Sequence, residues 1–189
     1  PATAEYDRQM EMEMGRRFLS HLGLKVDSDM LQTYRQAVDS WFSRPDVIRP
    51  YPEVFDVLTR LQEQGYQLGI ISNWGWNLGK RVAQVGLDGF FKVIWASAYA
   101  GYNKPHPEIF RQALAQMDLF PERALYVGDS YQYDVLGARQ ARMAVALVDR
   151  SGTADHADVA VISDLWGVFH LLGESPGSLT KQGPAVHPA

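Results

Sequence analysis

The sequence predicts an α/β protein, with helices on both faces of a parallel sheet and a small all-helical unit before it. Three observations lead to this fold class. The first 49 residues show only helical spacing of apolar side chains, a proline-rich stretch follows, and helix and strand patterns then alternate up to residue 173. Strands that alternate with helices along a chain form a parallel sheet whose two faces are both covered.

Composition and charge argue against several other classes of protein. At 189 residues the chain is long enough for one core with an accessory lobe, and its 46% hydrophobic and 21% charged residues are ordinary for a globular protein. No apolar stretch approaches the ~20 residues that cross a bilayer, so we expect no membrane partner. The net charge of -4, without clustered Lys and Arg, argues against nucleic acid.

The chain contains no cysteine, which excludes disulfides, thiolate metal sites and cysteine nucleophiles. This absence fits a reducing compartment. The first residues, PATAEYDRQMEMEM, also lack the charged-then-apolar pattern of a signal peptide. We therefore expect a cytoplasmic location.

The all-helical unit is predicted to contain two helices, over residues 4–22 and 29–42. Apolar side chains such as Leu31 and Trp41 recur at helical spacing in the second helix. The stretch RPDVIRPYP then interrupts the pattern, which places a domain boundary near Pro50.

The α/β core is predicted over residues 50–173, after a helical unit over 1–49. Pro52 is placed to start its first helix and Gly65 to stop it. The elements expected next are strands over 66–71, 91–95, 124–128, 144–149 and 159–162, and helices over 78–85, 107–117, 135–141 and 164–172. Residues 174–189 are rich in Gly, Pro and Ser, so we expect a flexible tail.

Polar side chains follow three of these strands, at the carboxyl ends where ligands bind in an open parallel sheet. Ser72 and Asn73 follow the first strand, Lys104 lies in the loop after the second, and Asp129 and Asp134 follow the third. A hydroxyl, backbone N–H groups and a lysine suit a phosphoryl group, and a carboxylate pair suits Mg2+. The combination predicts magnesium-assisted phosphoryl chemistry at this edge of the sheet.

Each of these residues also has a purely structural interpretation. Ser72 or Asn73 can support a turn or cap the next helix, and Lys104 can be a solvated loop lysine. Asp129 can be a turn residue, and Asp134 can cap the helix that follows it. Their order and their common position at strand ends favour the functional interpretation.

Three segments resemble the second, third and fourth motifs of the haloacid dehalogenase superfamily. They are IISN, NKPHPEIF and YVGDSYQYDVLGAR, in the family's order, and the resemblance covers about residues 51–149. It implies a Rossmann-like sheet, and it likens the helical unit to the cap that such enzymes carry. His106 stands where the family often has an acidic residue, a departure that we interpret as neutral.

The resemblance also implies a role for each polar residue. Ser72 would hydrogen-bond a phosphoryl oxygen, and Lys104 would hold the nucleophile and the transferring group. Asp129 would ligate Mg2+, and Asp134 would support the metal directly or through water. The metal-free dehalogenating branch typically replaces the first of these acids, so the resemblance implies a Mg2+-dependent phosphatase acting on a small phosphorylated metabolite.

Substrate choice in this family is commonly set by the cap and by residues after the second motif. Asn73 and Trp74 are therefore the predicted substrate-binding residues, and Trp74 with Trp76 could wall an aromatic pocket for the leaving group. The alternative is that one or both tryptophans merely pack beneath the cap.

The family nucleophile is an aspartate in an Asp-x-Asp motif after the first strand, and no strand here carries one. The local match, KVDSDML, lies between helical patterns, and Asp29 with Gln32 is typical of a capping box. The family places the nucleophile strand between the strands that end at Ser72 and Asp129, so we expect it outside this chain. Its absence would leave a gap of about 10 Å, because neighbouring strands lie ~4.8 Å apart.

Three explanations for this absence stay open: an upstream segment carries the strand, its two neighbours have closed up, or another chain supplies it. Open inner edges would invite self-association. The chain alone is expected to be inactive, and the competing function is a non-catalytic phosphate-binding, metal-binding or interaction module. A flavodoxin-like module ranks last, because it does not explain Lys104 together with the acid pair.

Overall fold

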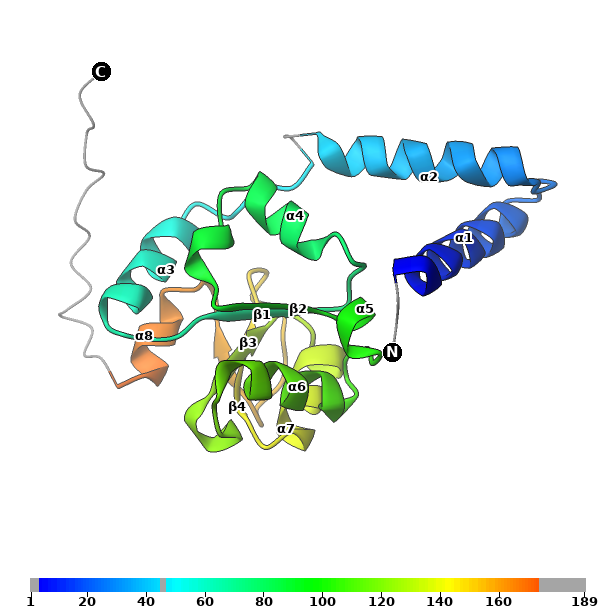
Figure 1. Ribbon diagram of the computed structural model, residues 1–189. Coiled ribbons are helices and arrows are strands. Elements are labelled where there is room, and N and C mark those ends of the chain that lie inside the picture. The colour runs from blue at the N-terminus through cyan, green and yellow to red at the C-terminus, as the bar shows by residue number, and fades with distance from the viewer. Residues whose placement is uncertain (1–3, 45–46, 174–189) are drawn as a thin grey trace, which may run out of the picture.

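The computed structural model describes residues 4–44 and 47–173. In Figure 1, α1 (Ala4–His21) and α2 (Ser28–Ser43) form a helical hairpin that projects from the rest of the chain. The two predicted helices are thus confirmed. The predicted tail, 174–189, lies outside the described residues.

The start of α2 corrects one detail of the sequence analysis. Asp27, and not Asp29, is the N-cap: its Oδ1 accepts a hydrogen bond from the backbone N–H of Met30 at 2.8 Å. Because the helix begins at Ser28, Asp29 already lies in its first turn, where its charge favours the helix dipole. The capping box of Asp29 with Gln32 is therefore wrong, although the segment does start a helix.

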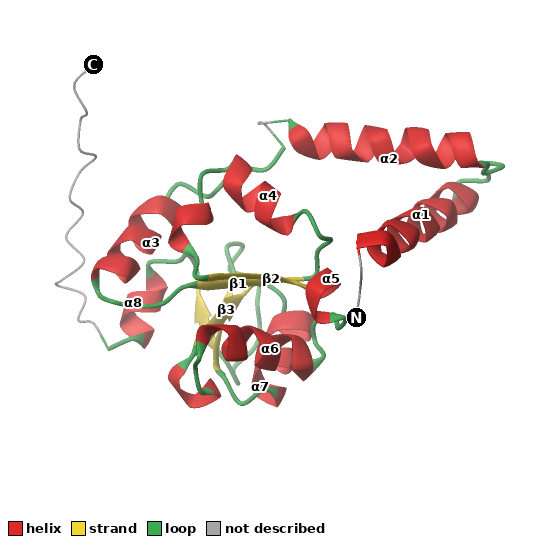
Figure 2. Cartoon of the chain, viewed as in Figure 1, coloured by secondary structure: helices red, strands yellow, loops and turns green. Residues whose placement is uncertain are grey.

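The α/β part follows the predicted order of elements (Figure 2). Its helices are α3 (Val54–Glu63), α4 (Leu78–Gln84), α5 (Ser97–Ala100), α6 (Pro107–Met117), α7 (Leu136–Gln140) and α8 (Gly167–Leu171). Its strands are β1 (Gly69–Ser72), β2 (Val93–Ala96), β3 (Leu125–Gly128), β4 (Ala144–Val148) and β5 (Ala160–Ile162). The sequence did not predict α5, the 3-10 turns Asp88–Phe90 and Pro121–Arg123, or the π-helical turn Tyr131–Val135. Such short elements show no periodicity.

The strands form two separate parallel sheets, β1–β2 and β3–β4–β5. Between β1 and β3 lies a largely apolar cavity of about 380 Å³, lined by residues of both strands and of α3, α6 and α8. The side chain of Tyr126, on β3, reaches toward β1, and its Oη lies 3.3 Å from the carbonyl oxygen of Ile71. The neighbours have therefore not closed up, and that explanation for the missing strand is wrong. We call this cavity the strand slot.

Helices cover both faces of the sheets, which confirms the predicted fold class. Ile109 and Phe110 of α6 form one buried cluster with residues of α7, and Tyr126 packs against it. Val57 of α3 and Phe169 of α8 belong to a second buried cluster. Leu68, which precedes β1, and residues of β3 and β4 pack against this cluster. Figure 1 shows α6 and α7 on the opposite side of the strands from α3.

An ion pair ties the end of β4 to the start of α3. Arg150 lies 2.6 Å from Glu53 and its guanidinium covers the ring of Tyr51 at 3.5 Å. Burial alone would raise the pKa of Glu53, but backbone hydrogen bonds and Arg150 outweigh it and hold the pKa below its ordinary value of 4.5. The first residues of the α/β part are thereby fixed against the end of β4, the middle strand of its sheet.

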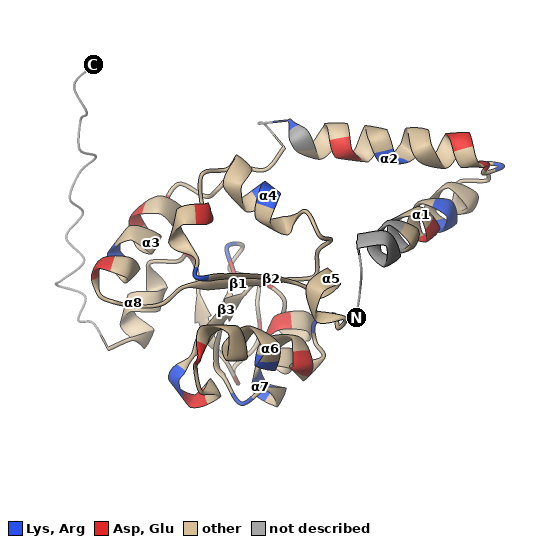
Figure 3. Cartoon of the chain, viewed as in Figure 1, with Lys and Arg blue, Asp and Glu red and all other residues tan. Residues whose placement is uncertain are grey.

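Two further properties bear on partners. None of the described helices is long and apolar enough to cross a membrane. Figure 3 shows Lys and Arg interspersed with Asp and Glu along the described elements. The charge pattern is thus mixed, as the sequence predicts.

Candidate active site

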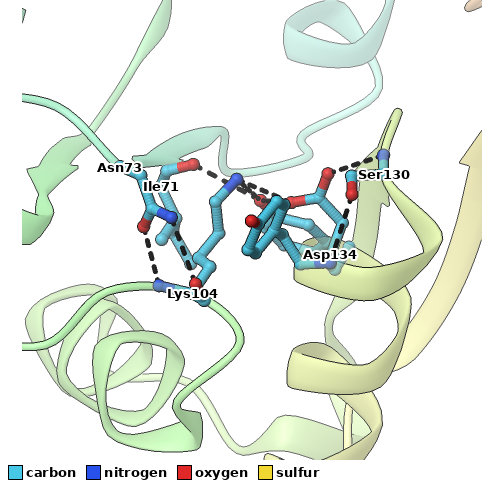
Figure 4. A network of polar contacts seen from close by, with 7 residues as sticks. Ile71, Asn73, Lys104, Ser130 and Asp134 are labelled. Carbon is cyan, nitrogen blue, oxygen red and sulfur yellow. Dashed lines mark hydrogen bonds and ion pairs between the residues drawn. The ribbon is translucent and has the colours of Figure 1, made fainter. Parts of the chain in front are cut away.

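Three of the predicted site residues, Asn73, Lys104 and Asp134, belong to one network of polar contacts (Figure 4). Ser72 is the last residue of β1, and Asp129 directly follows β3. Lys104 lies between α5 and α6, and its Nζ pairs with Asp134 Oδ1 at 2.6 Å. The carboxyl ends of separate strands therefore bring together residues that are far apart in the sequence, as expected for a parallel sheet.

Asp134 is the centre of this network. It is only 2% exposed, and its Oδ1 accepts hydrogen bonds from Lys104 Nζ at 2.6 Å and from Tyr126 Oη at 3.0 Å. Its Oδ2 accepts from the backbone N–H of Ser130 at 2.9 Å. A carboxylate so deeply buried needs such partners, because burial of an unpaired charge is very costly.

The π-helical turn and Gly128 allow Asp134 to reach this position. Asp134 lies inside the turn, and Ser130 is the N-cap, whose side chain accepts from the backbone N–H of Tyr133. The alternative that Asp134 caps the following helix is therefore wrong. A Cβ on Gly128 would lie 2.4 Å from both Cβ and Cγ of Asp134, so only glycine permits this approach.

Tyr126 is a site residue that the sequence analysis missed. Burial and the nearby Asp134 carboxylate raise the pKa of its hydroxyl far above the ordinary value of 10.0. The hydroxyl therefore stays protonated, donating to Asp134 and accepting from Lys104 Nζ at 3.1 Å. A tyrosine within a buried strand was the available signal, since its hydroxyl needs a polar partner there.

Asn73 holds the Lys104 loop in place. Its Oδ1 accepts from the backbone N–H of Lys104 at 2.7 Å, and its Nδ2 donates to the carbonyl of the same residue at 3.1 Å. The loop then enters α6, where His106 Nδ1 caps the helix by accepting from the N–H of Glu108. Asn73 thus positions the lysine, and its predicted contact with substrate stays a prediction.

Ser72 and Asp129 have free polar groups within the part of the chain that the structure describes. The Ser72 hydroxyl, half-buried, and the exposed Asp129 carboxylate form no hydrogen bond or ion pair with any described residue. Both are thus available to a ligand above the carboxyl ends of β1 and β3. No group of three or more His, Asp or Glu side chains gathers into a metal site among residues 4–44 and 47–173.

The donor set fits Mg2+ in part. Mg2+ commonly uses one or two carboxylates and takes its other oxygen ligands from phosphate and water. Asp129 is the free carboxylate here, whereas both oxygens of Asp134 already accept hydrogen bonds.

The two tryptophans after the second motif face different surroundings. Trp74 meets the ring of Phe42 of α2 edge-on at 5.6 Å, and its Nε1 donates to Asn77 Oδ1 at 2.8 Å. Trp76 packs against Tyr99, with ring centroids 4.7 Å apart. Trp74 therefore faces the helical hairpin, while its predicted role in substrate binding stays a prediction.

Comparison with known proteins places this geometry in a family. The haloacid dehalogenase-like hydrolase profile matches residues 3–148. A glyceraldehyde 3-phosphate phosphatase of Methanothermobacter thermautotrophicus is 36% identical over 140 residues, 67% of this chain and 60% of the relative. The pyrophosphatase PpaX of Anoxybacillus flavithermus is 32% identical over 157 residues, 79% of this chain and 70% of the relative.

Solved structures of similar fold include members of the same family. A 2-haloacid dehalogenase from Pseudomonas syringae has a TM-score of 0.70 at 27% identity, covering 86% of this chain and 71% of that one. A phosphatase from Thermococcus onnurineus, with a TM-score of 0.63 at 20% identity over 90% of this chain and 92% of that one, shows the fold alone. The chain spans 40% to 60% of the length of three glyceraldehyde 3-phosphate phosphatases that it matches. The profile match establishes that this chain belongs to the haloacid dehalogenase-like hydrolase family.

Proposed function

We propose that this chain is the cap and core portion of a Mg2+-dependent phosphatase that hydrolyses a small phosphorylated metabolite. One observation carries the proposal: Lys104 pairs with the buried Asp134, while Ser72 and Asp129 keep free polar groups at the carboxyl ends of β1 and β3, the two strands that border the strand slot. Cap denotes the helical unit of residues 1–49, and core the residues 50–173.

Each residue would act on the phosphoryl group in a distinct way. The Ser72 hydroxyl would donate to a phosphoryl oxygen, and Lys104 Nζ would stabilise the charge that develops on the transferring group. Asp129 would hold Mg2+, which supplies further charge neutralisation when bound. Asp134 would fix the lysine and the backbone of Ser130, and would contact the metal at most through water.

The nucleophile would be an aspartate of an Asp-x-Asp segment outside this chain, placed by a strand in the slot. Its carboxylate oxygen would attack phosphorus, and the bond from phosphorus to the leaving-group oxygen would break, giving an aspartyl phosphate. Water would then attack phosphorus, releasing phosphate and the free aspartate. Since both strands beside the slot are open edges, the same edges would support self-association in the strand's absence.

The names of the relatives support a phosphatase over a dehalogenase. The sequence relatives described above are named as hydrolases of glyceraldehyde 3-phosphate and pyrophosphate. One structural neighbour is named as a 2-haloacid dehalogenase, but the retained Asp129 favours a metal-dependent reaction. The competing proposal is a non-catalytic binding module, which the lack of a nucleophile strand in the described residues favours.

Hydrolysis of p-nitrophenyl phosphate, with and without Mg2+, tests the proposal. We would compare this chain with a form preceded by a strand that ends in an Asp-x-Asp segment, and with that form carrying Lys104→Met. Mg2+-dependent turnover in the extended form alone, lost in Lys104→Met, is the expected result. Chloride release from 2-chloropropionate without phosphate release would favour the dehalogenase. If neither substrate reacts while the extended form folds, the binding module is the better explanation.

A further inference from the structure

A second cavity lies between the helical hairpin and the core, with a volume of about 190 Å³. Its walls include Tyr34 and Phe42 of α2, and Trp74 of the loop after β1. Drug-sized ligands occupy pockets of about 300–1,000 Å³. This cavity therefore suits a smaller group of a few heavy atoms, with an apolar part that can lie against aromatic rings.

The cavity shares the loop after β1 with the candidate active site. Trp74 follows Ser72 by two residues, and its carbonyl accepts hydrogen bonds from Ser97 Oγ at 3.3 Å and from the N–H of Ala98 at 3.2 Å. Its indole is fixed by Asn77. Trp74 therefore links the loop that follows Ser72 with the wall of the cavity.

Three charged side chains line this cavity, and two of them serve the packing of α2 on α4. Arg81 is buried and donates to the carbonyl of Phe42 at 2.8 Å and to Gln84 Oε1 at 3.1 Å. Asp39 lies 3.9 Å from the same guanidinium. These contacts hold the hairpin against the core, so both charges are already engaged.

Arg35 is different from these two residues. It is half-buried, lines the cavity, and forms no hydrogen bond or ion pair with any residue in the described ranges. A guanidinium fork binds a carboxylate or phosphate through two parallel hydrogen bonds, and does so more strongly where water is scarce. Arg35 and Arg81 outnumber the one lining carboxylate, so the cavity favours an anion.

We propose that Arg35 binds an oxyanion, a carboxylate or a second phosphate, on the leaving group of the substrate. The substrate class is then a short phosphate ester with two anionic ends, one at Ser72 and Lys104 and the other in the cavity. This inference rests on the proposed phosphatase function. It makes Arg35 a specificity-determining residue, since it touches the leaving group and not the reacting phosphorus.

The test uses the Asp-x-Asp-extended form and three substrates: phosphoglycolate, propane-1,3-diyl bisphosphate and the neutral-ended 2-hydroxyethyl phosphate. Arg35→Gln should lower kcat/KM about 10-fold to 100-fold for the first two, as expected for hydrogen bonds between charged groups, and leave the third within about twofold. Arg35→Lys should retain part of the preference. Lys80→Gln, an exposed cation on α4 outside the cavity, is the matched control. Equal losses on all three substrates, or no loss, would overturn the proposal.

A binding measurement separates this inference from the proposed function. Calorimetric titration of the chain itself with phosphoglycolate and with inorganic phosphate requires no nucleophile. Weaker binding of phosphoglycolate but not of phosphate in Arg35→Gln supports the anion site even if no turnover is found. Turnover of p-nitrophenyl phosphate with no effect of Arg35→Gln on phosphoglycolate binding would refute the anion site and leave the phosphatase intact.

Discussion

Replacement of Lys104 by Met tests the buried ion pair through folding stability. The substitution keeps the length of the side chain and removes its charge. Lys104 Nζ lies 2.6 Å from Asp134 Oδ1, and the two side chains are 13% and 2% exposed. Asp134 would keep the Ser130 N–H and the Tyr126 hydroxyl as partners, but it would lose its countercharge.

The expected cost follows from this geometry. Removal of one partner of a buried pair typically destabilises a protein by about 3–5 kcal/mol. Two donors, the Tyr126 hydroxyl and the Ser130 N–H, still bond to Asp134, so we expect a cost of about 3 kcal/mol. Urea m-values of about 1–3 kcal/mol per M convert this loss into a midpoint lower by roughly 1–3 M. A domain with about 5–15 kcal/mol of stability would still fold.

Urea unfolding at pH 7, followed by tryptophan fluorescence and circular dichroism, measures this cost. Lys104→Met, Asp134→Leu and the double variant complete a double-mutant cycle, in which the double variant should be at least about 1 kcal/mol more stable than additivity gives. The exposed Lys80→Met is the control and should change stability by less than about 0.5 kcal/mol. Additive single effects, or a Lys104→Met cost no larger than the control's, would refute the buried pair and make Lys104 a solvated loop residue.

Three other predictions follow from the site and the fold. Asp129→Asn in the extended form should weaken Mg2+ activation about 10-fold or more, because an anionic ligand is lost; an unchanged Mg2+ titration would contradict its role. Gly128→Ala should cost about 1–3 kcal/mol in urea unfolding, since its Cβ would lie 2.4 Å from Asp134; unchanged stability would show that Asp134 has room to shift. The lowered pKa of Glu53 means that its pairing with Arg150 stabilises the fold above the ordinary pKa of 4.5 and is lost as the pH falls through the folded value. The difference in Tm between the wild type and Glu53→Gln should therefore be constant from pH 6 to 8 and shrink below about pH 4.5; a difference that grows on acidification would have the wrong sign.

The sequence could predict where the site lies, but not how its atoms contact one another. Ser72, Lys104 and Asp129 were found because apolar runs and glycines show where strands end. The contact of Lys104 with Asp134 joins residues 30 positions apart and depends on how two sheets face each other. No local pattern encodes that distance, and the same holds for the Asn73 hydrogen bonds to the Lys104 loop.

Short elements also could not be predicted from the sequence. The π-helical turn extends over five residues, too few for a periodic signal, and it decides that Asp134 faces inward instead of capping α7. The predicted N-cap, Asp29, and the observed one, Asp27, are two positions apart. Which residue caps a helix depends on where the helix begins, and sequence patterns place that first residue only approximately. Predictions of whole elements were accordingly confirmed, whereas those of single contacts at their ends were not.

The position of the Tyr126 hydroxyl means that the strand slot and Lys104 would respond to each other. The Ile71 carbonyl points into the slot, where it meets this hydroxyl at 3.3 Å. Under the proposed function, an incoming strand would offer that carbonyl a backbone N–H. The hydroxyl would then turn fully to Asp134, and the lysine that shares this carboxylate would be set in place as the nucleophile arrives. Assembly of the sheet and preparation of the site would thus be a single event.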